Sequence, residues 1–103
     1  MSSVRDLPIS LDRDAIAAFC RRHHIRKLSL FGSVLTDRFT DESDVDMLVE
    51  FEREHVPGLF RFVRMEEELS QIVERKVDLR TAEDLSRYFR EEVVAGAEAV
   101  YAP

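Results

Sequence analysis

The first apolar pattern along the chain has the spacing of a helix. Between residues 12 and 22 the apolar side chains recur at intervals of one, three and four residues, at Ala15, Ile16, Phe19 and Cys20. This spacing places them on one face of a helix. Ser10 or Asp12 precedes the pattern, and both residue types cap helix N-termini. The pattern predicts a helix that packs on a core, with Cys20 as a small core residue.

Two strand-like segments follow this helix. Residues 27–31 read KLSLF, in which Ser29 is the only polar side chain after Lys27, and residues 45–51 read VDMLVEF. Their length and apolar content are typical of strands. Between them, residues 33–37 predict a short helix or turn, and residues 41–43 predict a polar loop.

A longer helix pattern begins after Pro57-Gly58, which interrupts the chain. The helix is predicted to run to about Glu74, with one apolar stripe formed by Leu59, Phe62, Met65, Leu69 and Ile72. A short third strand follows at residues 76–79. Successive strand residues point to opposite faces, so Val77 and Leu79 are predicted to lie on one face and Asp78 on the other.

The end of the chain predicts one more helix and completes the fold class. Thr81 followed by Asp84 resembles a capping box. The last helix is predicted to carry Leu85, Tyr88, Phe89, Val93, Gly96 and Val100. The order of elements predicts an α/β fold, a small mixed β-sheet flanked by helices. At 103 residues we expect a single domain over residues 1–103, with residues 1–10 loosely ordered.

Composition narrows the classes of function. The chain is 45% hydrophobic and 35% charged, with a formal net charge of −6. An acidic chain lacks the basic surface that gives nucleic-acid binding most of its affinity, so no direct nucleic-acid binding is expected. The single cysteine excludes an internal disulfide framework and fits a reducing compartment. No apolar run approaches the roughly 18 residues of a membrane span, and residues 1–10 lack the apolar core of a signal peptide. A cytoplasmic protein is expected.

The densest group of chemically informative residues lies between residues 31 and 51. Gly32-Ser33 ends the first predicted strand, and Asp44-Val45-Asp46 begins the second after ten intervening residues. Residues two apart on a strand share a face, so Asp44 and Asp46 bring two carboxylates together. Such oxygen ligands suit Mg²⁺, which binds one or two carboxylates plus substrate phosphates. A glycine allows close approach of the backbone to a phosphate. The combination is typical of phosphoryl or nucleotidyl transfer.

These residues resemble the minimal nucleotidyltransferases of the DNA polymerase beta superfamily. The shared pattern is Gly-Ser, about ten residues, Asp-x-Asp, and a third acid on a later strand, here Asp78. The resemblance extends roughly from residue 12 to residue 101. It departs where many relatives carry Arg and Gly after the serine, because this chain has Thr36 and Asp37 there and only Arg38 as a nearby cation.

The resemblance implies ATP as substrate and two Mg²⁺ ions. Asp44 and Asp46 would hold the nucleotide-bound metal ion. Asp78 would bind the second ion and help to deprotonate the attacking hydroxyl. Gly32 and Ser33 would bind the nucleotide. The alternative for the three acids is that they are solvated carboxylates at strand ends.

The resemblance also implies a partner. Stand-alone domains of this kind often act as antitoxins that attach AMP to a tyrosine hydroxyl of a HEPN-domain ribonuclease toxin. The size of the chain fits a protein acceptor, because larger nucleotidyltransferases use an extra domain to hold theirs. The alternatives are an antitoxin that neutralises its toxin by non-covalent docking, and transfer to a small molecule such as an aminoglycoside.

Three other groups of residues allow two interpretations. The basic cluster, Arg21, Arg22, His23, His24, Arg26 and Lys27, either offsets a helix dipole or contacts a phosphate or an acidic partner. Adjacent histidines diverge on a helix, so His23 and His24 are not expected to share a metal ion. Tyr88 and Phe89 belong either to the core or to a partner surface. Gly96 in a helix is costly unless close packing, within the chain or against a partner, compensates.

Overall fold

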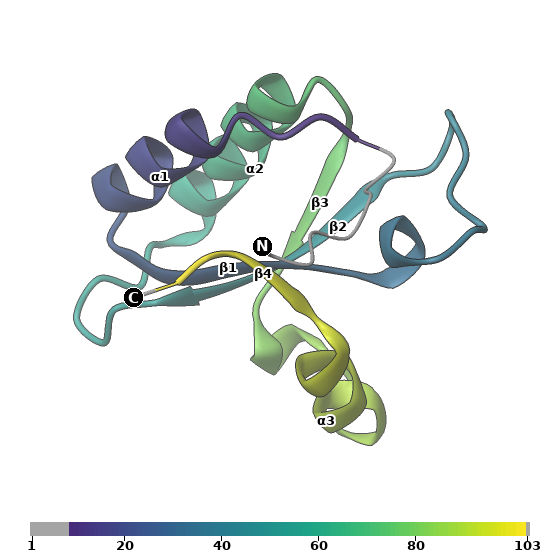
Figure 1. Ribbon diagram of the computed structural model, residues 1–103. Coiled ribbons are helices and arrows are strands. Elements are labelled where there is room, and N and C mark those ends of the chain that lie inside the picture. The colour runs from purple at the N-terminus through teal and green to yellow at the C-terminus, as the bar shows by residue number, and fades with distance from the viewer. Residues whose placement is uncertain (1–8, 103) are drawn as a thin grey trace.

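Four strands form one mixed sheet in the order β3-β2-β1-β4 (Figure 1). In the computed structural model, which describes residues 9–102, they are β1 (Ile25–Phe31), β2 (Val45–Phe51), β3 (Val77–Arg80) and β4 (Glu98–Tyr101). β1 is antiparallel to both of its neighbours, β2 and β4. β2 and β3 are parallel. The predicted α/β fold with a small mixed sheet is therefore confirmed.

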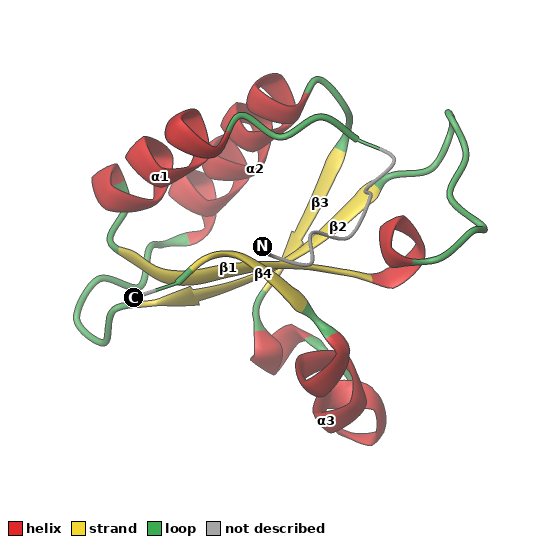
Figure 2. Cartoon of the chain, viewed as in Figure 1, coloured by secondary structure: helices red, strands yellow, loops and turns green. Residues whose placement is uncertain are grey.

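The helices lie on both sides of this sheet. Figure 2 shows α1 (Arg13–Arg22) and α2 (Leu59–Val73) on one face and α3 (Arg87–Gly96) on the opposite side. Two 3₁₀ helices, η1 (Gly32–Leu35) and η2 (Ala82–Asp84), follow β1 and β3. The core lies between the sheet and the α1/α2 pair, and its largest buried side chains include Phe19, Ile16, Leu28, Met47 and Leu69. None of the residues of α3 is buried.

Helix boundaries agree closely with the sequence pattern. Asp12 caps α1, with its Oδ1 accepting from the backbone N–H of Ala15 at 3.0 Å. Gly58 precedes α2, and Glu74 ends it in the left-handed conformation (φ 58°). Cys20 is fully buried, and burial raises the pKa of its thiol to about 12. It is a core residue, as predicted, and has no accessible thiolate.

Glu68 joins the two helices that cover the core. Its carboxylate accepts from Arg22 Nη2 at 2.6 Å and contacts His23 Nε2 at 3.1 Å. Burial alone would raise the pKa of Glu68, but the hydrogen bonds from Arg22 and His23 outweigh it and lower the pKa. Part of the predicted basic cluster therefore ties the end of α1 to α2.

The end of the chain departs from the prediction. The last helix, α3, ends at Gly96 and does not extend to Val100 as predicted. Glu98–Tyr101 forms β4, so Val100 lies in a strand. Ala97 is already extended, and Glu98 and Ala99 pair with Leu30 and Ser29 of β1. A free sheet edge at β1 overrides the local helix preference of this alanine-rich segment. The helix also begins later than predicted, at Arg87, because the Thr81–Asp84 capping box lies at the start of η2 instead.

Two other predictions concern the N-terminal residues and membrane-spanning segments. The expectation of a loosely ordered lead-in falls mainly on residues 1–8, which lie outside the described residues. Across residues 9–102, no helix is long and apolar enough to cross a membrane.

Candidate active site

Strand pairing brings two of the predicted acids to one place. On the parallel strands β2 and β3, Asp46 pairs in register with Asp78. On the antiparallel strands β1 and β2, Asp46 pairs with Phe31, the residue before Gly32. Residues that pair in register project to the same face of a sheet. Asp46, Asp78 and the Gly32-Ser33 segment therefore meet from three different parts of the chain.

Gly32 lies directly against the Asp46 carboxylate. Its φ of 79° is in the left-handed region that favours glycine. A Cβ atom at this position would lie 2.4 Å from Asp46 Oδ2. The glycine is therefore required both for its backbone conformation and for the space beside the carboxylate. Because residue 32 has no side chain, its backbone is exposed next to Asp46. A phosphate site beside a metal-binding acid requires such an exposed backbone.

Asp46 is in an unfavourable environment for a charged side chain. Burial raises its pKa above the usual 3.8, and the negative charges of Asp78 and Asp44 raise it further, while Arg80 lowers it. A carboxylate whose ionised form is disfavoured by neighbouring carboxylates gains most from a cation. The donor set of hard oxygens fits Mg²⁺.

Asp44 and Ser33 are placed less tightly than Asp46. Asp44 is exposed and directly precedes β2, so it lies at the strand end and not within the strand. The 3₁₀ helix η1 begins at Gly32 with Phe31 as its N-cap, so Ser33 lies inside η1 and not at its N-cap. Within the described structure the Ser33 hydroxyl makes no hydrogen bond, while its carbonyl accepts from Thr36 at 2.9 Å. The hydroxyl is available to a ligand.

Arg75 organises the loop that carries Asp44, a role that the sequence analysis missed. Its Nη2 donates to the carbonyls of Thr40 and Ser43, at 2.8 and 3.1 Å, and its guanidinium lies 4.7 Å from the centre of the Phe39 ring. The Ser43 Oγ also accepts from the Thr40 N–H at 3.0 Å. The only sequence signal for Arg75 was its place three residues before Asp78.

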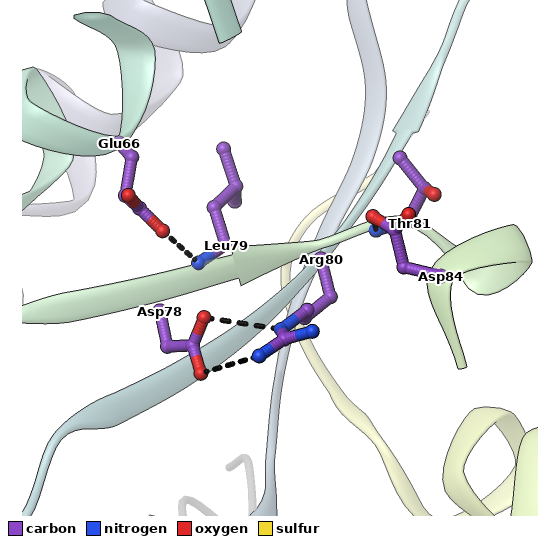
Figure 3. Close-up of polar contacts among 6 residues, drawn as sticks. All are labelled: Glu66, Asp78, Leu79, Arg80, Thr81 and Asp84. Atoms are coloured by element: carbon purple, nitrogen blue, oxygen red, sulfur yellow. Dashed lines mark hydrogen bonds and ion pairs between the residues drawn. The ribbon is translucent and has the colours of Figure 1, made fainter. Parts of the chain in front are cut away.

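The third acid has a partner on its own strand. Arg80 Nε donates to Asp78 Oδ1 at 3.1 Å and Arg80 Nη2 donates to Oδ2 at 3.3 Å, as Figure 3 shows. The backbone of β3 between them is held from α2, because Glu66 Oε2 accepts from the Leu79 N–H at 2.8 Å. Asp78 is thus held on a fixed strand, but its carboxylate is engaged by a guanidinium.

The three acids do not converge fully in this structure. Among residues 9–102, one group of three histidine, cysteine or acidic residues has ligand atoms all within 4.8 Å of one another: His24, Glu52 and His55. Asp44, Asp46 and Asp78 do not meet this limit. The fold brings Asp46 beside Asp78 in register, while Asp44 is exposed and Asp78 is bound by Arg80.

Comparison with known proteins agrees with this geometry. The sequence model of the nucleotidyltransferase domain family matches residues 13–100. The chain belongs to this family. It is 38% identical over 58 residues to the protein adenylyltransferase MntA of Thermococcus cleftensis, an alignment that covers 56% of this chain and 57% of MntA. The chain spans about three fifths of the length of the curated relatives it matches.

Solved structures show the same fold. A candidate minimal nucleotidyltransferase superposes with a TM-score of 0.67 and 31% identity, covering 84% of this chain and 85% of that one. A chain from the complex of a tri-AMPylated HEPN toxin of Shewanella oneidensis with an MNT antitoxin superposes with a TM-score of 0.63 and 18% identity. That match covers 88% of this chain and 70% of the other. At this lower identity the second match establishes the fold alone.

Proposed function

We propose that this protein is a Mg²⁺-dependent adenylyltransferase antitoxin, which transfers AMP from ATP to a tyrosine hydroxyl of a HEPN-domain ribonuclease toxin in the cytoplasm. The observation that carries the proposal is the meeting of Gly32, Asp46 and Asp78: Asp46 and Asp78 pair in register on β2 and β3, and Gly32, directly after β1, lies against the Asp46 carboxylate. The adenylyltransferase and toxin-complex names of its relatives support the choice of nucleotide and partner.

Each residue of the site has a role in this reaction. Asp44 and Asp46 would hold the Mg²⁺ ion that accompanies the triphosphate, and Asp78 would hold a second. Bound there, Mg²⁺ supplies charge neutralisation at the phosphates. The exposed backbone at Gly32 and the free hydroxyl of Ser33 position the phosphates. Asp78 accepts the proton of the tyrosine hydroxyl as its oxygen bonds to the α-phosphorus, and the bond to the β-phosphate breaks to release pyrophosphate.

A protein acceptor suits the surface around the acids. Two cavities of the described structure, of about 250 and 290 Å³, are lined by residues such as Ser29, Leu48 and Phe62 and by none of the three acids. A small-molecule acceptor would need an enclosing pocket at the acids. A macromolecular acceptor brings its own surface, so its tyrosine can approach an open site.

Exposed aromatic side chains offer a docking surface for such a partner. Tyr88 and Phe89 of α3 are 86% and 62% exposed, and Phe60 of α2 is 84% exposed. They are therefore not core residues. Tyr88 and Phe89 are neighbours on α3, whereas α2 lies on the opposite side of the sheet. Large exposed apolar side chains are typical of interaction sites. This observation also favours the second candidate function, neutralisation of the toxin by docking alone.

One experiment separates the two candidates. The toxin would be co-expressed with wild type or with Asp44→Asn/Asp46→Asn and then weighed by mass spectrometry. Catalysis predicts AMP on a toxin tyrosine with wild type, and continued toxicity with the variant. Docking predicts protection by both and no change of mass. Asp37→Asn/Asp41→Asn, which removes two exposed acids of the same loop, controls for the change in net charge and should behave as wild type.

A further inference from the structure

We propose that Arg80 is a positioning residue that holds Asp78 while the site is empty and moves to the triphosphate when a metal ion takes Asp78. The inference deepens the proposed function and rests on it for the identity of the ligands. It starts from the paired hydrogen bonds between the two side chains, at 3.1 and 3.3 Å. Two parallel bonds from a guanidinium to one carboxylate occupy the oxygens that a metal ion would need.

The pair is built so that it can open. Asp78 and Arg80 are two apart on β3, so both project from the same face of the strand. Their side chains are 35% and 48% exposed. Exposed ion pairs are weak, because water solvates the separated charges nearly as well. A divalent ion at Asp78 can therefore displace the guanidinium without breaking a buried contact.

Arg80 also opposes the repulsion among the acids. Asp44 and Asp78 both disfavour the charge on Asp46, and Arg80 acts against them. While Arg80 is bound to Asp78, its positive charge reduces the repulsion among the three carboxylates. Their oxygens do not converge to within 4.8 Å of one another. Without a bound metal ion, the guanidinium would thus offset the negative charge of Asp78, in an arrangement that differs from the one that two metal ions require.

After release from Asp78, the Arg80 guanidinium can bind phosphate on the same face of the sheet. Arg80 pairs in register with Leu48, two pairs beyond Asp46 and Asp78 along the parallel strands. The loop after Ser33 has Thr36 and Asp37, and so supplies little positive charge to a triphosphate. Arginine binds phosphate with the same planar group that binds carboxylate. Arg80 can add a second cation to Arg38, the one that this loop carries.

The test measures binding without any toxin. Mn²⁺ titrated into the ATP-free protein, followed by electron paramagnetic resonance, should bind Arg80→Met several-fold more tightly than wild type, because the competing cation is gone. MgATP should bind Arg80→Met about tenfold more weakly, and Arg80→Lys should restore part of that loss. Arg26→Met, which removes a similarly exposed arginine paired with Glu50, is the matched control and should change neither affinity.

Each half of the inference can fail on its own. Unchanged or weaker Mn²⁺ binding by Arg80→Met would overturn the competition with metal, and unchanged MgATP binding would overturn the transfer to phosphate. Both measurements differ from toxin modification, so an unmodified toxin contradicts the proposed function while leaving these affinities to decide the role of Arg80.

A second site follows from an independent observation. The geometry points to a transition-metal site formed by His24, Glu52 and His55, for an ion such as Zn²⁺. Their ligand atoms lie within 4.8 Å of one another, and His24 Nδ1 is 3.9 Å from Glu52 Oε1. Two imidazoles and one carboxylate are a ligand set of catalytic zinc sites, with water completing the coordination.

Backbone contacts hold these three residues together. The Glu52 N–H donates to the His24 carbonyl at 3.0 Å, and the His55 N–H donates to the Glu52 carbonyl at 2.9 Å. The His24 and His55 rings stack with their centres 3.8 Å apart. The group lies before β1 and after β2, at the end of the strand pair opposite the Phe31–Asp46 pair.

A double comparison tests this site. Zn²⁺ should raise the melting temperature of wild type and of Asp44→Asn/Asp46→Asn, and should fail to raise that of His24→Ala/His55→Ala. Mg²⁺ with ATP should show the reverse dependence on the two variants. A rise with Zn²⁺ that survives His24→Ala/His55→Ala would overturn the assignment, and so would the absence of a rise in wild type.

Discussion

Gly32 and Asp46 are in direct contact across the β1–β2 pair, with no room for a side chain at residue 32. A Cβ there would lie 2.4 Å from Asp46 Oδ2. Gly32, which begins the proposed phosphate-binding segment, and Asp46 are therefore fixed relative to each other by the register of two strands. The geometry needs no ligand to form.

Gly32→Ala should damage the site and destabilise the fold. An L-residue at a φ of 79° costs about 1–2 kcal/mol from conformation alone, and displacement of the Asp46 carboxylate adds to this. The free energy of unfolding, measured with urea, should fall by at least that amount, and metal binding should weaken. Gly96→Ala is the control, because a Cβ there meets nothing within 4 Å. Equal stability of Gly32→Ala and wild type would contradict the contact.

The elements around this contact could be predicted because the local sequence pattern and the packing of the folded chain favour the same secondary structure. Residues 45–51 alternate with the period of a strand, and the structure has β2 over the same residues. The stripe through Met65 and Leu69 likewise predicted α2. The Gly-Ser and Asp-x-Asp spacing identified the candidate site residues because only their types and intervals were needed.

The missed features depend on contacts that no local pattern records. β4 forms because β1 has a free edge, while its sequence, with Glu98 between two alanines, has a helical preference. The pairing of Asp78 with Arg80 depends on rotamers, and the group of His24, Glu52 and His55 depends on a turn after β2 meeting the end of α1. Gly96 has no close packing within the described chain, so its role is not explained by the fold.

Metal binding should be measurable without an acceptor. An ion that binds only the folded state stabilises it, by about 2.7 kcal/mol at a hundredfold excess over its dissociation constant. Mg²⁺ or Mn²⁺ should therefore raise the melting temperature of wild type, more so with ATP, and should not raise that of Asp44→Asn/Asp46→Asn. Differential scanning fluorimetry with Asp37→Asn/Asp41→Asn as the control is sufficient. The same response in wild type and in the site variant would show that the ion binds elsewhere.

The metal-free protein should become more stable when Asp46 loses its charge. Burial first, and then Asp78 and Asp44, raise the pKa of Asp46 in the folded state above 3.8. The folded state therefore binds this proton more tightly than the unfolded state, and ionised Asp46 destabilises the fold above the raised pKa. In the presence of a chelator, Asp46→Asn should unfold at a higher urea concentration than wild type at pH 7.

This difference should shrink as the pH falls through the raised pKa of Asp46 towards 3.8, because wild type is then protonated as well. Asp41→Asn, in an exposed loop position, should show no such pH dependence. A metal-free Asp46→Asn that is less stable than wild type at pH 7 would mean that the carboxylate is already compensated without a metal ion.

Ser33 and Asp78 should affect nucleotide transfer in different ways. The Ser33 hydroxyl is free to bind a phosphate, so Ser33→Ala should raise KM for ATP and leave kcat nearly unchanged. Asp78 lies in register with Asp46. In the proposed reaction it would receive the proton of the attacking hydroxyl, and general-base help contributes roughly 10²–10⁴-fold. Asp78→Asn should therefore retain measurable ATP binding while transfer of labelled AMP to the toxin falls by at least about a hundredfold. The Asn variant also frees Arg80 from its ion pair, so its ATP binding should not be weaker than that of Ser33→Ala. Full transfer by Asp78→Asn would remove Asp78 from the reaction, and loss of all ATP binding in that variant would place it among the phosphate-positioning groups instead.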